Sequence, residues 1–196
     1  MSQKIKDIIA SSIAVKQEFL NNERLVSELT MIAESMVTCL RAGNKVLWCG
    51  NGGSAADAQH LAAELSGRFY TDRAPLYSEA LHVNSSFVTA VANDYSYDVI
   101  YSRMLQGCGR KGDIIVGIST SGNSKNVMNA LEVAREKGIT TVGFTGSTGG
   151  KMKDLCDFLI NVPSNDTPRI QESHILAGHI ICQLVEELMF ASENIK

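Results

Sequence analysis

The sequence predicts an α/β fold in which a doubly wound parallel sheet follows an N-terminal helical extension. Three observations lead to this prediction. From Asn44 onward, short apolar segments alternate with helical patterns, as expected for parallel strands that are buried on both faces. Turns rich in glycine, serine and threonine follow three of these segments. The first 42 residues, by contrast, contain only helical patterns.

Two helices are expected in the extension, over residues 2–20 and 24–41. Apolar residues recur at helical spacing in both, for example Ile5, Ile8 and Ile9 in the first and Leu25 and Leu29 in the second. Neither helix carries a cluster of ligand-type side chains. An apolar stripe on an extension of this kind often packs against a partner subunit.

Five strands are expected after the extension, over residues 45–49, 80–83, 113–119, 140–145 and 158–162, with a helix over residues 124–137. His82 falls in the second of these strands and is expected to be structural. Because parallel sheets of this class bind ligands at the carboxyl ends of their strands, the turns that follow the strands are the candidate site.

Length and composition restrict the classes of protein to consider. The chain has 196 residues, of which 44% are hydrophobic, and we expect a single domain over residues 1–196 that includes the extension 1–42. A net charge of −3 gives no support for a nucleic-acid partner. Five cysteines without CxxC spacing favour reduced, buried thiols. No signal peptide or membrane-length apolar run is found, so we expect no membrane partner and a cytoplasmic protein.

The first glycine turn joins the strand at 45–49 to a helix with a polar face. Asn51 opens it, and Gly52 and Gly53 allow the backbone to approach a ligand closely. Ser54, followed by Asp57 three residues later, resembles a capping box. The turn therefore predicts a helix N-terminus that holds a phosphate or a carboxylate.

Two further turns carry residues of the same kind. Residues 117–124 contain four hydroxyl side chains, those of Ser119, Thr120, Ser121 and Ser124, and residues 145–150 form a third turn of this type. Backbone N–H groups with short hydroxyls suit a phosphate without a nucleotide, since the chain has neither a GxGxxG motif nor a P-loop lysine. The alternative is that these residues only form loops and helix caps.

The segment Gly117–Ser124, which reads GISTSGNS, resembles the phosphosugar-binding loop of the sugar isomerase (SIS) domain family. Residues 50–54, His60 with Glu64, Asn93 with Asp94, and residues 169–172 with His179 extend the resemblance over essentially the whole chain. It implies a flavodoxin-like fold, a homotetramer and an aldose–ketose isomerase. The expected reaction converts sedoheptulose 7-phosphate into D-glycero-D-manno-heptose 7-phosphate through an enediol, for heptose nucleotide and surface polysaccharide synthesis.

Such an isomerase needs a base for the carbon proton and a group that manages protons on the two oxygens. We expect Glu64 to be the base and His179 the matching acid. From the local sequence alone, Glu64 could be a solvated helix residue and His179 a core histidine. Together the turns and the resemblance predict substrate contacts from Asn51, Gly52, Gly53, Ser54, Glu64, Asn93, Asp94, Ser119, Thr120, Ser121, Ser124 and Gln171.

A metal site is also expected. His60 and Glu64 share one helix face, and the resemblance to zinc-containing members adds Gln171 and His179 as ligands. On one straight helix, Gln171 and His179 are separated by about 12 Å along the axis, whereas zinc bonds are about 2 Å long. The spacing therefore predicts an active site at a subunit interface, with His179 supplied by a neighbour.

Two positions depart from the family pattern and leave the finer substrate contacts open. Asn84 stands where an aspartate is expected, and Pro168 precedes Arg169 but fits the first turn of a helix. Two alternative functions remain. One is a non-enzymatic relative that binds the bacterial replication initiator, against which Glu64 and His179 argue. The other is a different phosphosugar isomerase, although such enzymes usually carry attached domains.

Overall fold

The computed structural model describes residues 1–190, so residues 191–196 of the predicted domain lie outside the described part. Its centre is a five-stranded sheet in the order β2-β1-β3-β4-β5, and neighbouring strands pair in parallel. The strands are β1 (Val46–Gly50), β2 (Ser78–Ala80), β3 (Ile114–Ile118), β4 (Thr140–Thr145) and β5 (Phe158–Asn161). The predicted fold class, an α/β protein with a parallel sheet, is confirmed.

The strand expected over residues 80–83 is displaced toward the N-terminus. The chain pairs with β1 over Ser78–Ala80, and Leu81 and His82 form a turn, so the prediction that His82 lies in a strand is wrong. The side chain of Ser78 accepts a hydrogen bond from Trp48 Nε1 at 2.8 Å, which satisfies a polar group inside the core. A polar strand of this kind has no apolar run by which the sequence would reveal it.

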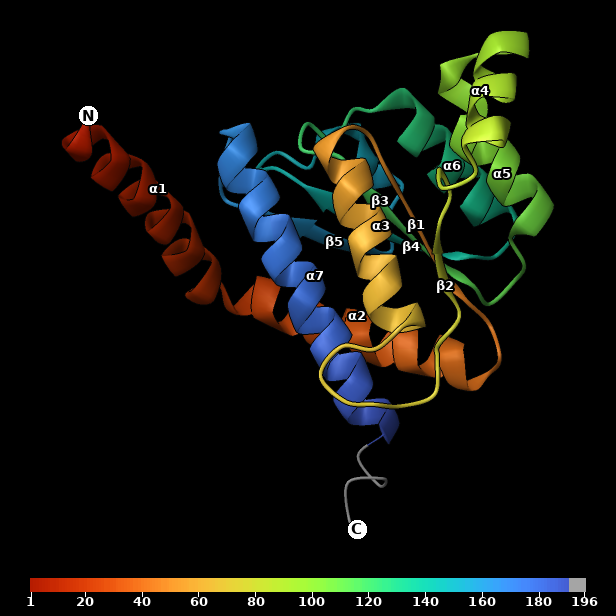
Figure 1. Cartoon of the computed structure of the whole chain (residues 1–196), viewed down its shortest axis with the longest axis horizontal. Helices are drawn as coiled ribbons and strands as arrows, with labels where there is room; N and C mark the ends of the chain where they lie inside the picture. The colour runs from red at the N-terminus through yellow and green to blue at the C-terminus, as the bar shows by residue number, and fades with distance from the viewer. Residues whose placement is uncertain (191–196) are drawn as a thin grey trace.

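Helices cover both faces of the sheet (Figure 1). One face packs against α2 (Glu23–Arg41), α3 (Gly53–Ser66) and α7 (Thr167–Phe190), and the other against α4 (Ser85–Asp94), α5 (Ile100–Cys108) and α6 (Lys125–Glu136). Short 3₁₀ helices, η1 (Tyr97–Val99) and η2 (Gly150–Asp154), complete the second face. Residues of β1 alternate between the two cores, which explains why its sequence is apolar throughout.

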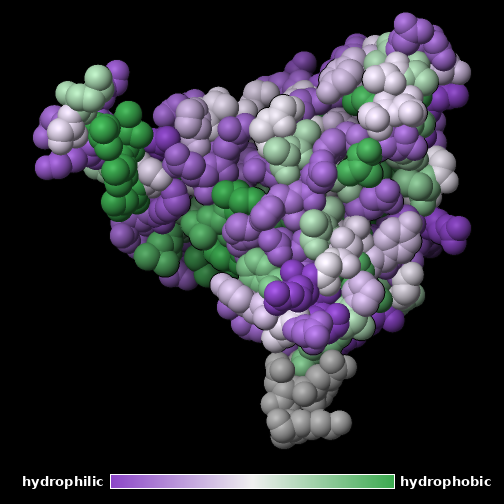
Figure 2. Space-filling model, viewed as in Figure 1, coloured by the Kyte–Doolittle hydropathy of each residue, from purple (hydrophilic) through white to green (hydrophobic). Residues whose placement is uncertain are grey.

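The N-terminal helix α1 (Ser2–Leu20) projects from the body of the molecule (Figure 1). Its isoleucines form an exposed stripe, and Ile13 is 61% exposed. Figure 2 shows this apolar surface continuing into a groove that is lined by α1, α2 and α7. The groove has a volume of about 280 Å³, and Phe19, Val26 and Ile180 are among its lining residues. None of the helices formed by residues 1–190 is long and apolar enough to cross a membrane.

Helices α3 and α7 lie side by side and run in the same direction (Figure 1). Gly53 at the start of α3 meets Gln171 near the start of α7, and Leu61 meets Gly178 further along. The approach is close, because a Cβ atom on Gly178 would lie 2.3 Å from Leu61 Cδ1. Residues about 118 positions apart in the sequence are therefore level with one another on the two helices.

Candidate active site

The first glycine turn differs in detail from the prediction. Gly52 adopts the left-handed region with φ 57°, and α3 begins directly after it at Gly53, without a side-chain hydrogen bond at its N-terminus. Ser54 and Asp57 both lie inside the helix, so the predicted capping box is wrong. The turn leaves the start of α3 free of a capping side chain, as an anion site at a helix N-terminus requires.

The side chain of Asn51 holds this turn in place. It forms a reciprocal amide pair with Asn126 at the start of α6, with distances of 2.8 and 2.9 Å, and its Oδ1 also accepts a hydrogen bond from Tyr97 at 3.1 Å. Asn126 and Tyr97 were not singled out from the sequence, because nothing local marks an amide that will pair with one 75 positions away. Both polar atoms of the Asn51 side chain thus form hydrogen bonds with other side chains of the described chain.

The second and third turns line one polar pocket of about 180 Å³. Ser119 and Ser124 bring their hydroxyl oxygens within 2.8 Å of each other, and the amide of Asn123 donates to Ser121 Oγ at 3.2 Å. The pocket is lined by Thr120, Ser121, Gly146, Ser147, Thr148, Asn165, Thr167 and Ile170. Asn165, Thr167 and Ile170 were not expected there. Hydroxyl and backbone groups at the carboxyl ends of β3 and β4 suit a phosphate group.

A second cluster forms where α3 and α7 pack together. His60 Nε2 lies 2.9 Å from His179 Nε2 and 3.1 Å from Glu64 Oε1, and the three side chains could hold a metal ion. Loss of hydration and the nearby His60 lower the pKa of His179, while Glu64 opposes the shift. We call these three residues the acid–base cluster.

The acid–base cluster is built from a single chain. The prediction that a neighbouring subunit supplies His179 to His60 and Glu64 is therefore wrong, because His179 of the same chain lies beside them. The parallel packing of α7 on α3 explains the difference, since it makes His179 level with His60. The geometry of one helix alone could not reveal this.

Gln171 lies elsewhere, at the start of the two helices. Its Nε2 is 2.7 Å from the point at which a Cβ atom on Gly53 would stand, so only glycine leaves room for this amide. Gly53 and His60 are about 10 Å apart along the axis of α3. The structure therefore separates Gln171 from the acid–base cluster of the same chain and places it beside the first glycine turn, as the predicted distance between Gln171 and His179 on one helix requires. The four-residue ligand set stays a prediction.

Asn93 and Asp94 form the last turn of α4, on the opposite face of the sheet from α3 and α7. Their exposed side chains bond to each other at 2.9 Å, and neither lines the polar pocket. The structure does not bring this pair to either cluster within one chain. Asn84 caps α4 by accepting from the amide of Phe87 at 3.0 Å, and Pro168 lies in the first turn of α7 as expected.

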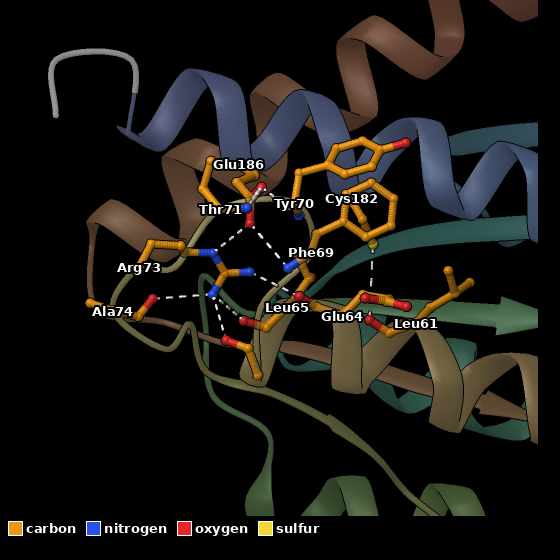
Figure 3. A network of polar contacts seen from close by, with 11 residues as sticks. Leu61, Glu64, Leu65, Phe69, Tyr70, Thr71, Arg73, Ala74, Cys182 and Glu186 are labelled. Carbon is orange, nitrogen blue, oxygen red and sulfur yellow. Dashed lines mark hydrogen bonds and ion pairs between the residues drawn. The ribbon is translucent and has the colours of Figure 1, made fainter. Parts of the chain in front are cut away.

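A buried ion pair, not anticipated from the sequence, lies at the end of α3, close to Glu64 (Figure 3). Arg73 Nε donates to Glu186 Oε2 at 3.0 Å, and the two side chains are only 1% and 4% exposed. Burial alone would raise the pKa of Glu186, but hydrogen bonds from the amides of Thr71, Phe69 and Tyr70 outweigh it and lower the pKa. A glutamate among apolar helix residues is a signal that could have drawn attention to this pair.

The fold and the two clusters define an α/β protein with a polar pocket suited to a small anion at its strand ends and with ionisable groups clustered on the adjoining helices. Residues 9–146 match the family model of the SIS domain, and the chain belongs to this family. The resemblance noted in the sequence is thus confirmed.

Relatives with known names agree with this assignment. The chain is 54% identical over 193 residues to the phosphoheptose isomerase of Aneurinibacillus thermoaerophilus, covering 98% of both chains. It is 53% identical over 186 residues to that of Mycobacterium tuberculosis, covering 95% of both. Among solved structures, phosphoheptose isomerase GmhA from Neisseria gonorrhoeae superposes with a TM-score of 0.89 at 42% identity, covering 95% of this chain and 98% of that one.

Proposed function

We propose that this protein is a phosphoheptose isomerase, which interconverts sedoheptulose 7-phosphate and D-glycero-D-manno-heptose 7-phosphate. Full-length similarity to relatives of that name supports the substrate. The observation that carries the chemistry is the acid–base cluster, in which His60 Nε2 lies 3.1 Å from Glu64 and 2.9 Å from His179. An aldose–ketose isomerase requires a base for the carbon proton and a group that moves protons on the oxygens, and a carboxylate with an imidazole can fill these two roles.

In the proposed reaction, Glu64 removes the proton from the carbon next to the carbonyl group, and an enediol forms. His179 exchanges protons with the sugar oxygens, because its lowered pKa keeps a neutral imidazole available near pH 7. The hydroxyls of Thr120 and Ser121, which line the polar pocket, and the paired hydroxyls of Ser119 and Ser124 next to them in the same turn hold the phosphate. Substrate binding and proton transfer are thus assigned to different clusters.

A zinc ion is part of the proposal, held by His60, Glu64 and His179. Two ligand atoms at tetrahedral zinc are about 3.3 Å apart for bonds of about 2 Å. His60 Nε2 lies 2.9 Å from His179 Nε2 and 3.1 Å from Glu64 Oε1, so each of these two pairs of atoms would move apart by only a few tenths of an ångström to bind zinc. Two histidines and a glutamate with an open fourth position are typical of catalytic zinc sites. When bound, zinc acts as a Lewis acid on the sugar oxygens.

We further propose a homotetramer in which each active site combines two subunits. Gly53, beside the phosphate turns, and Glu64 are about 16 Å apart along the axis of α3. That span exceeds the length of a phosphorylated seven-carbon sugar. The side chain of His60 is 51% exposed in the single chain, whereas proton transfer from carbon favours a site closed to water. The exposed stripe of α1 supplies an apolar surface for such an assembly.

In this arrangement the polar pocket of one subunit faces the acid–base cluster of another. Gln171, Asn93 and Asp94 would then reach substrate or metal from a subunit other than the one that supplies Glu64. We propose a cytoplasmic enzyme whose product enters heptose nucleotide and surface polysaccharide synthesis. A role confined to binding the replication initiator is not favoured, since a binding protein does not need the acid–base cluster.

The direct test is incubation of the purified protein with sedoheptulose 7-phosphate and detection of the aldose product. Phosphorylated ketoses of five and six carbons serve as comparison substrates. We expect turnover of the seven-carbon ketose and much slower turnover of the others. No aldose product from any of the three would overturn the proposed reaction, and preference for a shorter sugar would reassign the substrate.

A further inference from the structure

We propose that Arg73 and Glu186 are positioning residues that set the orientation of the acid–base cluster, although neither reaches the substrate. This inference rests on the proposed isomerase function. It arises from the segment of residues 67–77, here called the strap, which joins α3 to β2 without helix or strand. The strap passes the end of α3, close to Glu64, and the two residues hold it there (Figure 3).

Glu186 fastens the strap to α7. Its carboxylate accepts hydrogen bonds from three consecutive backbone amides, those of Phe69 at 3.1 Å, Tyr70 at 2.8 Å and Thr71 at 2.9 Å. Arg73 Nε is the fourth donor, at 3.0 Å. A buried carboxylate with four donors is satisfied and holds the strap in one conformation.

Arg73 fastens the strap to the end of α3. Its Nη2 donates to the carbonyl oxygen of Glu64 at 2.8 Å, and its Nη1 donates to the carbonyl of Leu65 at 2.8 Å and that of Gly67 at 3.1 Å. The last carbonyl groups of a helix have no partner within the helix, so a guanidinium here acts as a cap. One of the groups that it caps belongs to the proposed catalytic base.

The strap also contacts His179, the member of the acid–base cluster that lies on α7. The ring of Phe69 lies 5.7 Å from the imidazole of His179, measured between centroids. The amide of Phe69 is in turn held by Glu186. A single ion pair thus connects the backbone of Glu64 with the aromatic neighbour of His179. Small displacements of reacting groups reduce turnover sharply, so this restraint affects the reaction step more than binding.

A matched control exists at the amino ends of β1 and β3, away from Glu186. Asp113 is also a buried carboxylate, paired with Lys45 at 2.6 Å and accepting hydrogen bonds from the backbone amides of Lys45 and Arg110. It touches neither cluster. Asp113→Asn therefore removes a buried, paired charge of the same kind and leaves the hydrogen bonds of Arg73 and Glu186 intact, although Lys45 lies over the ring of Tyr77 at the far end of the strap.

The experiment compares Glu186→Gln, Arg73→Lys and Asp113→Asn with the parent protein, at a temperature at which circular dichroism shows all four folded. We expect Glu186→Gln to lower kcat about 10-fold or more, with KM within about twofold. Arg73→Lys, which keeps the charge but not the fork of donors, should lower kcat less. Asp113→Asn should leave kcat within about twofold of the parent.

Amide hydrogen exchange supplies a readout that needs no substrate. Residues 60–71 should exchange faster in Glu186→Gln and Arg73→Lys but not in Asp113→Asn. Unchanged kcat in both strap variants, an equal fall in Asp113→Asn, or unchanged exchange would each overturn the positioning role. If Glu186→Gln does not fold, Arg73→Lys decides the question. A parent protein without turnover would instead refute the proposed function, whatever the exchange result.

Discussion

The Nε2 atoms of His60 and His179 lie 2.9 Å apart, although the two residues are separated by 119 positions in the sequence. This meeting depends on two parallel helices, α3 and α7, that pack in a fixed register. It places two imidazoles and the carboxylate of Glu64 together in one chain. The chemistry of the protein can therefore be tested by changing groups one at a time.

Glu64→Gln should abolish proton abstraction while leaving phosphate binding intact, because the amide keeps the shape and loses the base. We expect kcat to fall by about 10²- to 10⁴-fold. Exchange of the C1 proton of sedoheptulose 7-phosphate with solvent, followed by NMR, measures the step directly. Glu187→Gln, an exposed change on α7, is the control. Exchange at the parent rate would exclude Glu64 as the base.

Ser121→Ala should mainly raise KM. A hydrogen bond to a charged group contributes about 1.5–3 kcal/mol, which corresponds to a rise in KM of about 10- to 100-fold. Steady-state kinetics give the split between KM and kcat, and Ser86→Ala on the exposed surface of α4 is the control. A collapsed kcat with unchanged KM would place the phosphate elsewhere.

Mixing inactive variants tests the two-subunit site. Ser121→Glu puts a negative charge where the phosphate binds, and Glu64→Gln removes the base. When these variants exchange subunits, interfaces with one intact pocket and one intact acid–base cluster form, so activity should return. A mixture of Glu64→Gln with His179→Ala should stay inactive, since both residues act within one cluster. If mass spectrometry verifies subunit exchange, activity in the Glu64→Gln and His179→Ala mixture, without activity in the Ser121→Glu and Glu64→Gln mixture, would refute this arrangement.

Zinc affinity should depend on all three residues of the cluster and on pH. His60→Ala is expected to weaken zinc binding by at least about 10-fold, measured by competition with a chromophoric chelator. Affinity should fall as the pH drops, because both imidazoles must be neutral to bind. The lowered pKa of His179 keeps that ring neutral at a pH where an ordinary histidine is charged. Equal affinity in the parent and His60→Ala would move the zinc site away from the cluster.

His174 should make the stability of the protein depend on pH. It is fully buried, and burial lowers its pKa to about 4 despite a hydrogen bond to the carbonyl oxygen of Thr145. Between about pH 6.5 and 4 the unfolded chain binds a proton that the folded chain does not. The free energy of unfolding should therefore fall by about 3 kcal/mol as the pH drops through this range.

Urea unfolding of the parent and of His174→Gln at several pH values separates this contribution from that of other groups. The glutamine amide can donate to Thr145 and does not titrate. We expect a shallower pH dependence in His174→Gln than in the parent. Identical dependence in the two proteins would show that His174 does not supply it.

Regular periodicity made most of the fold predictable. The helix expected over residues 2–20 is observed as Ser2–Leu20, and the strand over residues 140–145 as Thr140–Thr145. Apolar residues repeat at helical or strand spacing in these segments, and that spacing is a local property. β2 was misplaced because Ser78 satisfies its hydroxyl within the core, which no local pattern reveals.

The site was predictable in its parts and not in its arrangement. The turns around Gly52 and Ser121 could be identified because glycine and hydroxyl residues at strand ends have a direct physical meaning. The prediction that Gln171 and His179 of the same chain are too far apart to reach one ion agrees with their separate places on α7. Which of them meets His60 depends on the register of α7 on α3, and register is set by packing between distant segments.

The close contact at Gly178 has a consequence for interpreting mutational scans. Any side chain there, even a methyl group, would collide with the buried side chain of Leu61, so that Leu61 or one of the two helices must shift. The adjacent residue is His179, so the same shift would also displace its imidazole ring. In a saturation survey scored by activity, position 178 should tolerate substitution as poorly as position 64. Intolerance at this position would report the space between Gly178 and the side chain of Leu61, at a residue that has no reactive group to lose.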